Sequence, residues 1–182
     1  MKNFLRIVSV NVVEYICSCI KFDLPNGKTV DILSDVLNKM TKWIQDEEFK
    51  PESCGFILGY ENNVTHNITL SDITAPQAKD IRKRFFCKIA DRRHYEFLQK
   101  NKTKHNYYMG VWHTHPQKIP IPSNIDWKNW NGILKKDKTG SNYAFFVILG
   151  EKEFRIWVGD FSTQTISEIF EASKQDGIYT KG

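Results

Sequence analysis

The sequence predicts a single α+β domain in which a central mixed β-sheet is flanked by helices. The chain has 182 residues, enough for one sizeable hydrophobic core but short for two domains. Its composition, with 41% hydrophobic and 26% charged residues, excludes intrinsic disorder and fibrous classes. Strand-like and helix-like segments are mixed along residues 1–182, and no repeat, linker or low-complexity segment divides them.

The first half of the chain predicts four strands and one helix. Stretches rich in β-branched and apolar residues predict the strands, at residues 8–22, 29–33, 55–60 and around 67–73. The turn sequence Pro25-Asn26-Gly27 joins the first two into a hairpin. After Ser34 the apolar residues recur at three- and four-residue spacing, which predicts an amphipathic helix ending near Phe49.

The second half predicts two helices and three further strands. Pro76 is expected to open a long helix over about residues 77–100, which buries Ile81, Phe85 and Ile89. A strand over 107–115 then enters a proline-rich loop, which leads to a helix from Ser123 to Lys138. Residues 141–149 and 154–158 predict a closing hairpin, and the pattern beyond Ser162 fits strand and helix equally.

Composition also bears on the compartment. The longest apolar run, residues 144–149, is far too short to cross a bilayer, and polar residues interrupt the apolar N-terminal segment as no secretory signal would allow. A cytoplasmic protein is therefore expected. The cysteines are too scattered for a disulfide framework, so reduced thiols are expected at Cys17, Cys19, Cys54 and Cys87.

Positive charge is concentrated in one segment. The net charge of the whole chain is +5. Ten Lys or Arg against three Asp or Glu give residues 79–104 a net charge of +7. Such a run is usually a solvated helix surface, but it also suits docking of an acidic protein surface or of nucleic acid.

Two histidines suggest a metal site. His113 and His115 lie at positions i and i+2 of a predicted strand end, which places both imidazoles on one face of the sheet. This is a usable ligand spacing, although His-x-His alone also fits surface or core histidines. Asp126 offers a third ligand, and catalytic zinc takes three protein ligands and keeps a fourth position for water.

Helix capping is the alternative for the segment around Asp126. Ser123 with Asp126 three residues later is close to a capping box, which explains both residues by helix chemistry. The two interpretations are compatible, because a helix start is a rigid place to mount a ligand. Metal-bound water needs a base, and Glu52 precedes a buried strand from which its carboxylate can reach the site, although an isolated Glu after Pro51 is usually a solvated turn residue.

Taken together, these residues resemble the JAMM motif of MPN/JAB-domain zinc metalloproteases. The resemblance rests on Glu52 before a glycine-containing apolar strand, on His113-x-His115-Pro116, and on Ser123-x-x-Asp126 seven residues later. It covers roughly residues 31–158 and is closest to the bacterial JAB deconjugating peptidases, including those of CBASS anti-phage operons. Cys54, where bacterial members often have glycine, and Val111, where they often have glutamate, depart from the pattern.

The resemblance implies a curved mixed sheet and a zinc-dependent isopeptidase. His113, His115 and Asp126 would bind Zn²⁺, Glu52 would act as general base, and Ser123 would stabilise the oxyanion. The substrate would be a protein conjugated through the C-terminus of a ubiquitin-like protein or a CD-NTase. No cysteine would serve as nucleophile, no membrane partner is expected, and the oligomeric state stays open.

Two other functions remain possible from the sequence. Some MPN-fold proteins are metal-free scaffolds, but these characteristically lack the ligands that are all present here. Some JAB relatives associate with nucleic acid, which the basic segment permits. Among the aromatic residues, Trp112 alternates away from the histidines and is interpreted as core, and core is preferred to a peptide groove for Trp127 and Trp130.

Overall fold

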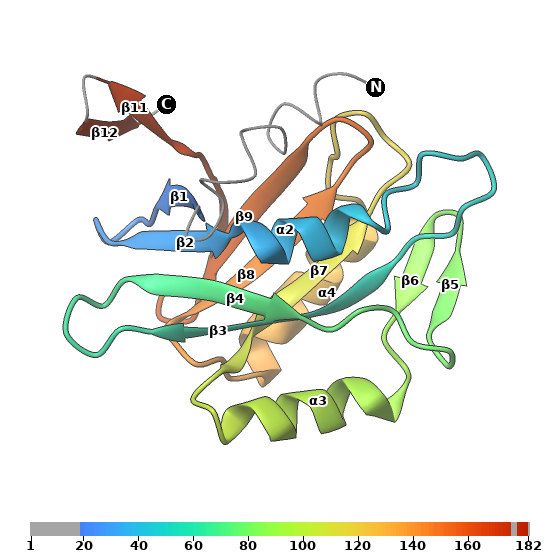
Figure 1. Ribbon diagram of the computed structural model, residues 1–182, viewed down its shortest axis with the longest axis horizontal. Coiled ribbons are helices and arrows are strands. Elements are labelled where there is room, and N and C mark those ends of the chain that lie inside the picture. Colours follow the sequence, from blue (N-terminus) through green and yellow to red (C-terminus); the bar gives the residue numbers. More distant parts are fainter. Residues whose placement is uncertain (1–18, 176–177, 182) are drawn as a thin grey trace.

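The computed structural model describes residues 19–175 and 178–181, and its centre is one mixed sheet of eight strands (Figure 1). The order across the sheet is β1-β2-β4-β3-β7-β8-β9-β10. Parallel pairing joins β2 to β4 and β7 to β8, and the other neighbours are antiparallel. The strands are β1 (Cys19–Asp23), β2 (Thr29–Leu33), β3 (Cys54–Glu61), β4 (Ile68–Ile73), β7 (Tyr107–Thr114), β8 (Tyr143–Leu149), β9 (Phe154–Asp160) and β10 (Thr165–Ile169).

Two small hairpins and three helices complete the described part of the chain. The hairpins are β5 (Ile81–Lys83) with β6 (Phe86–Lys88), and β11 (Ala172–Gln175) with β12 (Ile178–Lys181). The helices are α2 (Ser34–Thr41), α3 (Arg92–Lys102) and α4 (Asn124–Lys136). Neither hairpin is hydrogen-bonded into the large sheet as a further strand.

Both faces of the sheet are covered, so the central strands are apolar on both sides. On one face, Val36, Leu37 and Met40 of α2 pack with a large cluster that includes Phe145 and Val147. On the other face, α4 packs against β8 and β9. Its Trp130 stacks on Phe146 with ring centroids 4.7 Å apart. The alternation of neighbouring residues between the two clusters explains why β8 is buried throughout.

Close approach of backbones accounts for two glycines near the centre. A Cβ at Gly55 would lie 2.0 Å from the carbonyl oxygen of Thr74. Gly110 has a φ of +146° at an irregularity in the β3–β7 pairing. Glycine tolerates both conditions because it has no side chain. Gly55 thus allows β3 to approach the chain that follows β4, and Gly110 allows β7 to approach β8.

The fold class is confirmed, and most predicted elements lie where they were expected. Of the first predicted strand, residues 8–18 lie outside the described part. The helix predicted from Ser34 to Phe49 ends earlier, at Thr41. The buried side chain of Gln45 there donates instead to the carbonyl oxygens of Lys50 and Arg84. Such side-chain bonds to the backbone compete with helix formation.

The helix predicted over residues 77–100 is wrong. Its first part forms the β5–β6 hairpin, and α3 begins only at Arg92. The Asp80 carboxylate accepts hydrogen bonds from the backbone N–H groups of Gln77, Ala90 and Asp91, which closes the loop around the hairpin. Residues assigned to a buried helix face by periodicity are instead exposed, among them Phe85 at 74%. Local carboxylate capping overrode the helical pattern.

The basic residues of 79–104 are therefore divided between the hairpin and α3 and do not share one helix surface. Residues after Ser162, which fitted two interpretations, form strands β10, β11 and β12. Across residues 19–175 and 178–181, every helix falls short of the length and apolar character needed to cross a membrane.

Candidate metal centre and active site

The two histidines lie where β7 ends. His113 is in β7, and the backbone N–H of His115 donates to the carbonyl oxygen of Leu149 at the end of β8, so the strand geometry continues through both residues. Their Nε2 atoms are 3.0 Å apart, and both side chains are largely buried. The expectation that the i, i+2 spacing places both rings on one face agrees with this geometry.

Asp126 reaches the same point from the first turn of α4. Its Oδ1 is 3.1 Å from Nε2 of His113, and its Oδ2 is 3.5 Å from Nε2 of His115. Ser123 caps this helix: its backbone N–H and its hydroxyl both bond to Oδ2 of Asp126 at 2.6 Å, and its Oγ accepts from the Asp126 N–H. The capping box and the ligand geometry thus coexist.

These three side chains form a donor set that fits a divalent metal. One ligand atom from each of His113, His115 and Asp126 lies within 4.8 Å of the others. Burial lowers the pKa of His113, which favours the neutral imidazole that a metal requires. Two imidazole nitrogens with one carboxylate, in a partly buried pocket, are typical of catalytic zinc.

Charge coupling within the cluster agrees with this interpretation. Burial would raise the pKa of Asp126, but its hydrogen bonds with His113 and His115 hold it well below the usual range, so the carboxylate is ionised. Burial opposes protonation of His115, whereas the bond and charge of Asp126 raise its pKa overall.

Glu52 lies beside the histidines because of the pairing between β3 and β7. These strands are antiparallel with Cys54 opposite His113, so the residues two positions further out, Glu52 and His115, also face each other. Oε1 of Glu52 is 3.9 Å from Nε2 of His115. Burial raises the pKa of Glu52 to about 7, with His115 opposing the increase and Asp126 adding to it. Glu52 is thus no solvated turn residue, because only 6% of it is exposed.

The β5–β6 hairpin holds the backbone of Glu52. The Glu52 N–H donates to the carbonyl oxygen of Lys83 at 2.9 Å, and Nε of Arg82 donates to the carbonyl oxygen of Glu52 at 2.8 Å. A second guanidinium nitrogen of Arg82 bonds Oγ of Ser53, and the guanidinium lies over the Trp43 ring. The role of Arg82 is not predicted from the sequence, because the pattern of residues 77–100 indicates a helix.

Two glutamines bond to residues of the histidine segment and are also not predicted from the sequence. Oε1 of Gln117 lies 3.3 Å from Nδ1 of His115 and accepts from the Ile121 N–H, so it orients the ring whose other nitrogen faces the metal position. Gln45 accepts from the Thr114 hydroxyl between the two histidines and donates to Arg84 in the hairpin turn. Neither residue has a sequence spacing that indicates a site.

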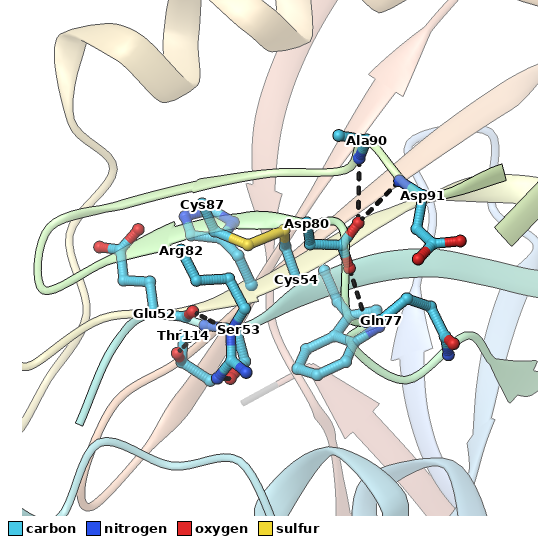
Figure 2. The surroundings of a disulfide bond; sticks show 12 residues. Glu52, Ser53, Cys54, Gln77, Asp80, Arg82, Cys87, Ala90, Asp91 and Thr114 are labelled. Atoms are coloured by element: carbon cyan, nitrogen blue, oxygen red, sulfur yellow. Dashed lines mark hydrogen bonds between the residues drawn. A yellow bond between two sulfur atoms is a disulfide. The ribbon is translucent and has the colours of Figure 1, made fainter. Parts of the chain in front are cut away.

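The cysteine prediction needs correction. Cys54 and Cys87 form a disulfide, with Cα atoms 6.0 Å apart (Figure 2). The hairpin carries Cys87 to the start of β3, an approach that is invisible while residues 77–100 are assigned to a helix. Cys19 is a free, exposed thiol, and Cys17 lies outside the described residues.

An open groove of about 1260 Å³ contains the cluster. Glu52, the two histidines and Asp126 line it together with both disulfide cysteines and with Phe85, Phe86 and Ile121. Phe85 and Ile121 are exposed large apolar side chains. The groove therefore joins a polar centre to an apolar rim, an arrangement suited to an extended peptide.

Trp112 and Trp130 belong to the core, as preferred from the sequence, and the half-buried Trp127 packs against it. Trp112 is fully buried on the opposite face from His113, and its Nε1 donates to the Thr74 carbonyl oxygen. Trp130 is 1% exposed and stacks within the second core cluster, with Trp127 packed edge-on against it at 5.2 Å. Val111, which departs from the family pattern, packs on the same cluster and lines the groove.

Comparison with known proteins finds one family match that spans the residues of this centre. Residues 34–159 match the family described as prokaryotic homologs of the JAB domain, and this range contains all five residues of the resemblance. The chain belongs to this family.

Two curated relatives carry the name CD-NTase/cGAS isopeptidase. The one from Vibrio cholerae serotype O1 is 30% identical over 76% of this chain and 85% of its own length. The one from a strain of Escherichia coli is 28% identical over 71% of this chain and 80% of its own. A solution structure from Desulfitobacterium hafniense, 12% identical, covers 75% of this chain and 87% of its own with a TM-score of 0.54, a likeness of fold alone.

Proposed function

We propose that this chain is a cytoplasmic zinc-dependent isopeptidase whose single domain cleaves a protein conjugate in bacterial anti-phage (CBASS) defence. The observation that carries the proposal is the convergence of His113, His115 and Asp126 at one point, with the buried carboxylate of Glu52 beside them. The cleaved bond would join the C-terminus of a CD-NTase or of a ubiquitin-like protein to an amine. The names of the two relatives and the family support this substrate class.

The metal would be held by His113, His115 and Asp126, whose donor atoms fit zinc. Bound zinc would supply Lewis-acid chemistry, by polarising the scissile carbonyl and lowering the pKa of a coordinated water toward about 7. Gln117 orients His115, and Ser123 orients Asp126, so both ligands have a second hydrogen bond that restrains them.

Glu52 is the proposed general base. Its carboxylate would take the proton of the attacking water and then give it to the leaving amine, which departs neutral. Burial, which raises the pKa of this carboxyl to about 7 in the metal-free chain, and the position beside His115 place Glu52 where it can accept and release a proton. No covalent intermediate with the chain is required, which agrees with both groove cysteines being held in a disulfide.

Ser123 is proposed to donate its hydroxyl to the developing oxyanion. That hydroxyl donates to Asp126 in this structure. To donate to the oxyanion, its O–H bond would have to rotate toward the substrate. Such a contact strengthens as charge develops on the carbonyl oxygen, and it therefore favours the transition state over the ground state.

The test is cleavage of a defined isopeptide conjugate by metal-loaded Glu52→Gln protein. The substrate is the C-terminal peptide of a CD-NTase joined to the ε-amine of a lysine peptide, and the products are measured by mass spectrometry. We expect kcat to fall by about 10²- to 10⁴-fold while zinc remains at the wild-type content. Glu61→Gln, which removes a carboxylate at the far end of β3, is the matched control and should retain activity.

A substrate trap extends the test to the native host. Conjugates that accumulate with Glu52→Ala protein and disappear with wild type would identify the substrate. Turnover at the wild-type rate by either Glu52 variant would contradict the proposed mechanism. Co-purification of nucleic acid or of an unmodified partner, without any cleavage, would favour the nucleic-acid or scaffold alternatives.

A further inference from the structure

The disulfide closes a ring of contacts around Glu52. Cys54 lies two residues after Glu52 in the chain, and Cys87 lies directly opposite Arg82 in the β5–β6 pairing. Arg82 in turn donates to the backbone carbonyl oxygen of Glu52. Figure 2 shows these groups together at the start of β3. The covalent bond therefore ties the hairpin to the same short segment that the hairpin positions by hydrogen bonds.

The hairpin has limited support from its own strands. Each strand has only three residues, and the pair is not hydrogen-bonded into the eight-stranded sheet as a further strand. Asp80 fixes the stem through backbone N–H groups, and Gln45 bonds the turn at Arg84. On β6 the link to β3 is the disulfide itself. Opening the disulfide would loosen β6 and, through the paired Arg82, the contact with Glu52.

The two sulfur-bearing residues differ in access. Cys54 is 6% exposed at the start of a buried strand, whereas Cys87 is partly exposed on the hairpin between Phe86 and Lys88. Thiol–disulfide exchange requires a thiolate to approach one sulfur in line with the bond. Cys87, on the hairpin, is therefore the more exposed residue of the two.

We propose that Cys54 and Cys87 form a reversible redox site, opened by a protein dithiol of the thioredoxin class, that controls the placement of Glu52. The consequence for turnover rests on the proposed function. In a cytoplasmic protein, a disulfide of this kind is usually transient, catalytic or redox-sensing, since structural disulfides belong to oxidising compartments. This disulfide lies next to the proposed base, so opening it would affect the placement of Glu52.

The exchange balances without a further reactant. A thiolate of the dithiol attacks Sγ of Cys87, the Cys54–Cys87 bond breaks, and Cys54 leaves as a thiolate that takes up a proton. The second thiol of the reductant then attacks the mixed disulfide. The reductant ends as an intramolecular disulfide, and the chain ends with two thiols. The reverse exchange with an oxidised dithiol restores the bond.

The test compares oxidised and thioredoxin-reduced samples of the zinc-loaded full chain. Alkylation followed by mass spectrometry should show two additional adducts, on Cys54 and Cys87, after reduction. Hydrogen exchange of the backbone N–H groups of residues 81–88 and of Glu52 should accelerate, while zinc content stays unchanged. On the isopeptide substrate, kcat should fall at least about threefold, the effect expected from a displaced base.

Two variants control the comparison. Cys87→Ser should show the reduced behaviour with or without thioredoxin, whereas Cys19→Ser, which removes the exposed free thiol, should keep the wild-type response. An inactive chain would contradict the proposed function alone. Alkylation and hydrogen exchange do not depend on cleavage, so they would still decide whether the redox site exists. A bond that thioredoxin does not open, or one that opens without faster exchange at Glu52, would overturn the redox proposal.

Discussion

The two sides of the candidate active site are built differently. His113 lies in a strand paired on both sides, opposite Cys54 of β3 and Ile148 of β8, and Asp126 is fixed by a capping box. Glu52 precedes its strand, and its backbone bonds instead to a hairpin of two three-residue strands. The proposed metal ligands are fixed by the sheet and by the capping box. The register of β3 with β7 also places Glu52 opposite His115, but the bonds to the Glu52 backbone come from a segment about thirty residues away. Metal binding and catalysis should therefore respond separately to substitution.

The largest effect on activity is expected when a proposed metal ligand on the sheet is removed. His113→Ala removes one of three ligands, so both zinc and cleavage should be lost, with zinc affinity falling by several orders of magnitude. Zinc content by mass spectrometry and cleavage of the isopeptide substrate should be measured on the same sample. His105→Ala, at an exposed histidine, should change neither. Stoichiometric zinc in the His113 variant would mean that the ligands are wrongly assigned.

The sequence predicts the proposed metal ligands well and the hairpin beside Glu52 poorly, and the reason is that only the first depend on local contacts. The proposed ligands follow local rules: the i, i+2 spacing of a strand placed His113 and His115 together, and the capping pattern placed Asp126 in the first turn of α4. The predicted helix over residues 77–100 failed because the Asp80 carboxylate bonds backbone N–H groups ten and eleven residues away, which no periodicity reveals. The contacts of Arg82 and the disulfide were missed with it.

A smaller effect should follow from breaking the hairpin side alone. Arg82→Met keeps much of the side-chain volume but removes the donors to Glu52 and Ser53. We expect kcat to fall about tenfold, a loss of ~1.4 kcal/mol in transition-state stabilisation, with zinc content and KM little changed. Arg82→Lys, which retains one donor, should recover part of the rate.

Lys83→Met is the matched control for Arg82. Its side chain is exposed, and its contact with Glu52 is made by the backbone carbonyl. Its kcat should therefore stay at the wild-type value. If Arg82→Met lost zinc as well as rate, metal binding and the placement of Glu52 would not be separable.

The smallest effect concerns Glu52 itself, and it is a change in the unfolding free energy of the metal-free protein. Burial raises the pKa of Glu52 from 4.5 to about 7 in the folded chain. The raised pKa means that the folded chain favours the protonated form of Glu52. The contribution of Glu52 to stability is therefore fully present below pH 4.5 and is lost as the pH rises through 7. Glu52→Gln should remove this loss, so at pH 8 the metal-free variant should be more stable than wild type by about 1–2 kcal/mol.

Urea unfolding at pH 4 and pH 8 provides the measurement for that prediction. The difference in unfolding free energy between wild type and Glu52→Gln should be concentrated at the higher pH. Equal differences at both values would show that Glu52 does not titrate in this range in the folded, metal-free chain.

The most direct test of the account is a zinc titration of metal-stripped protein with cleavage of the isopeptide substrate as readout. Activity should rise in proportion to added zinc and level off at one equivalent per chain, and His115→Ala protein should remain inactive throughout. Cleavage by the stripped protein at the rate of the loaded one, or full activity in the His115 variant, would contradict the assignment of this centre as a zinc-dependent isopeptidase.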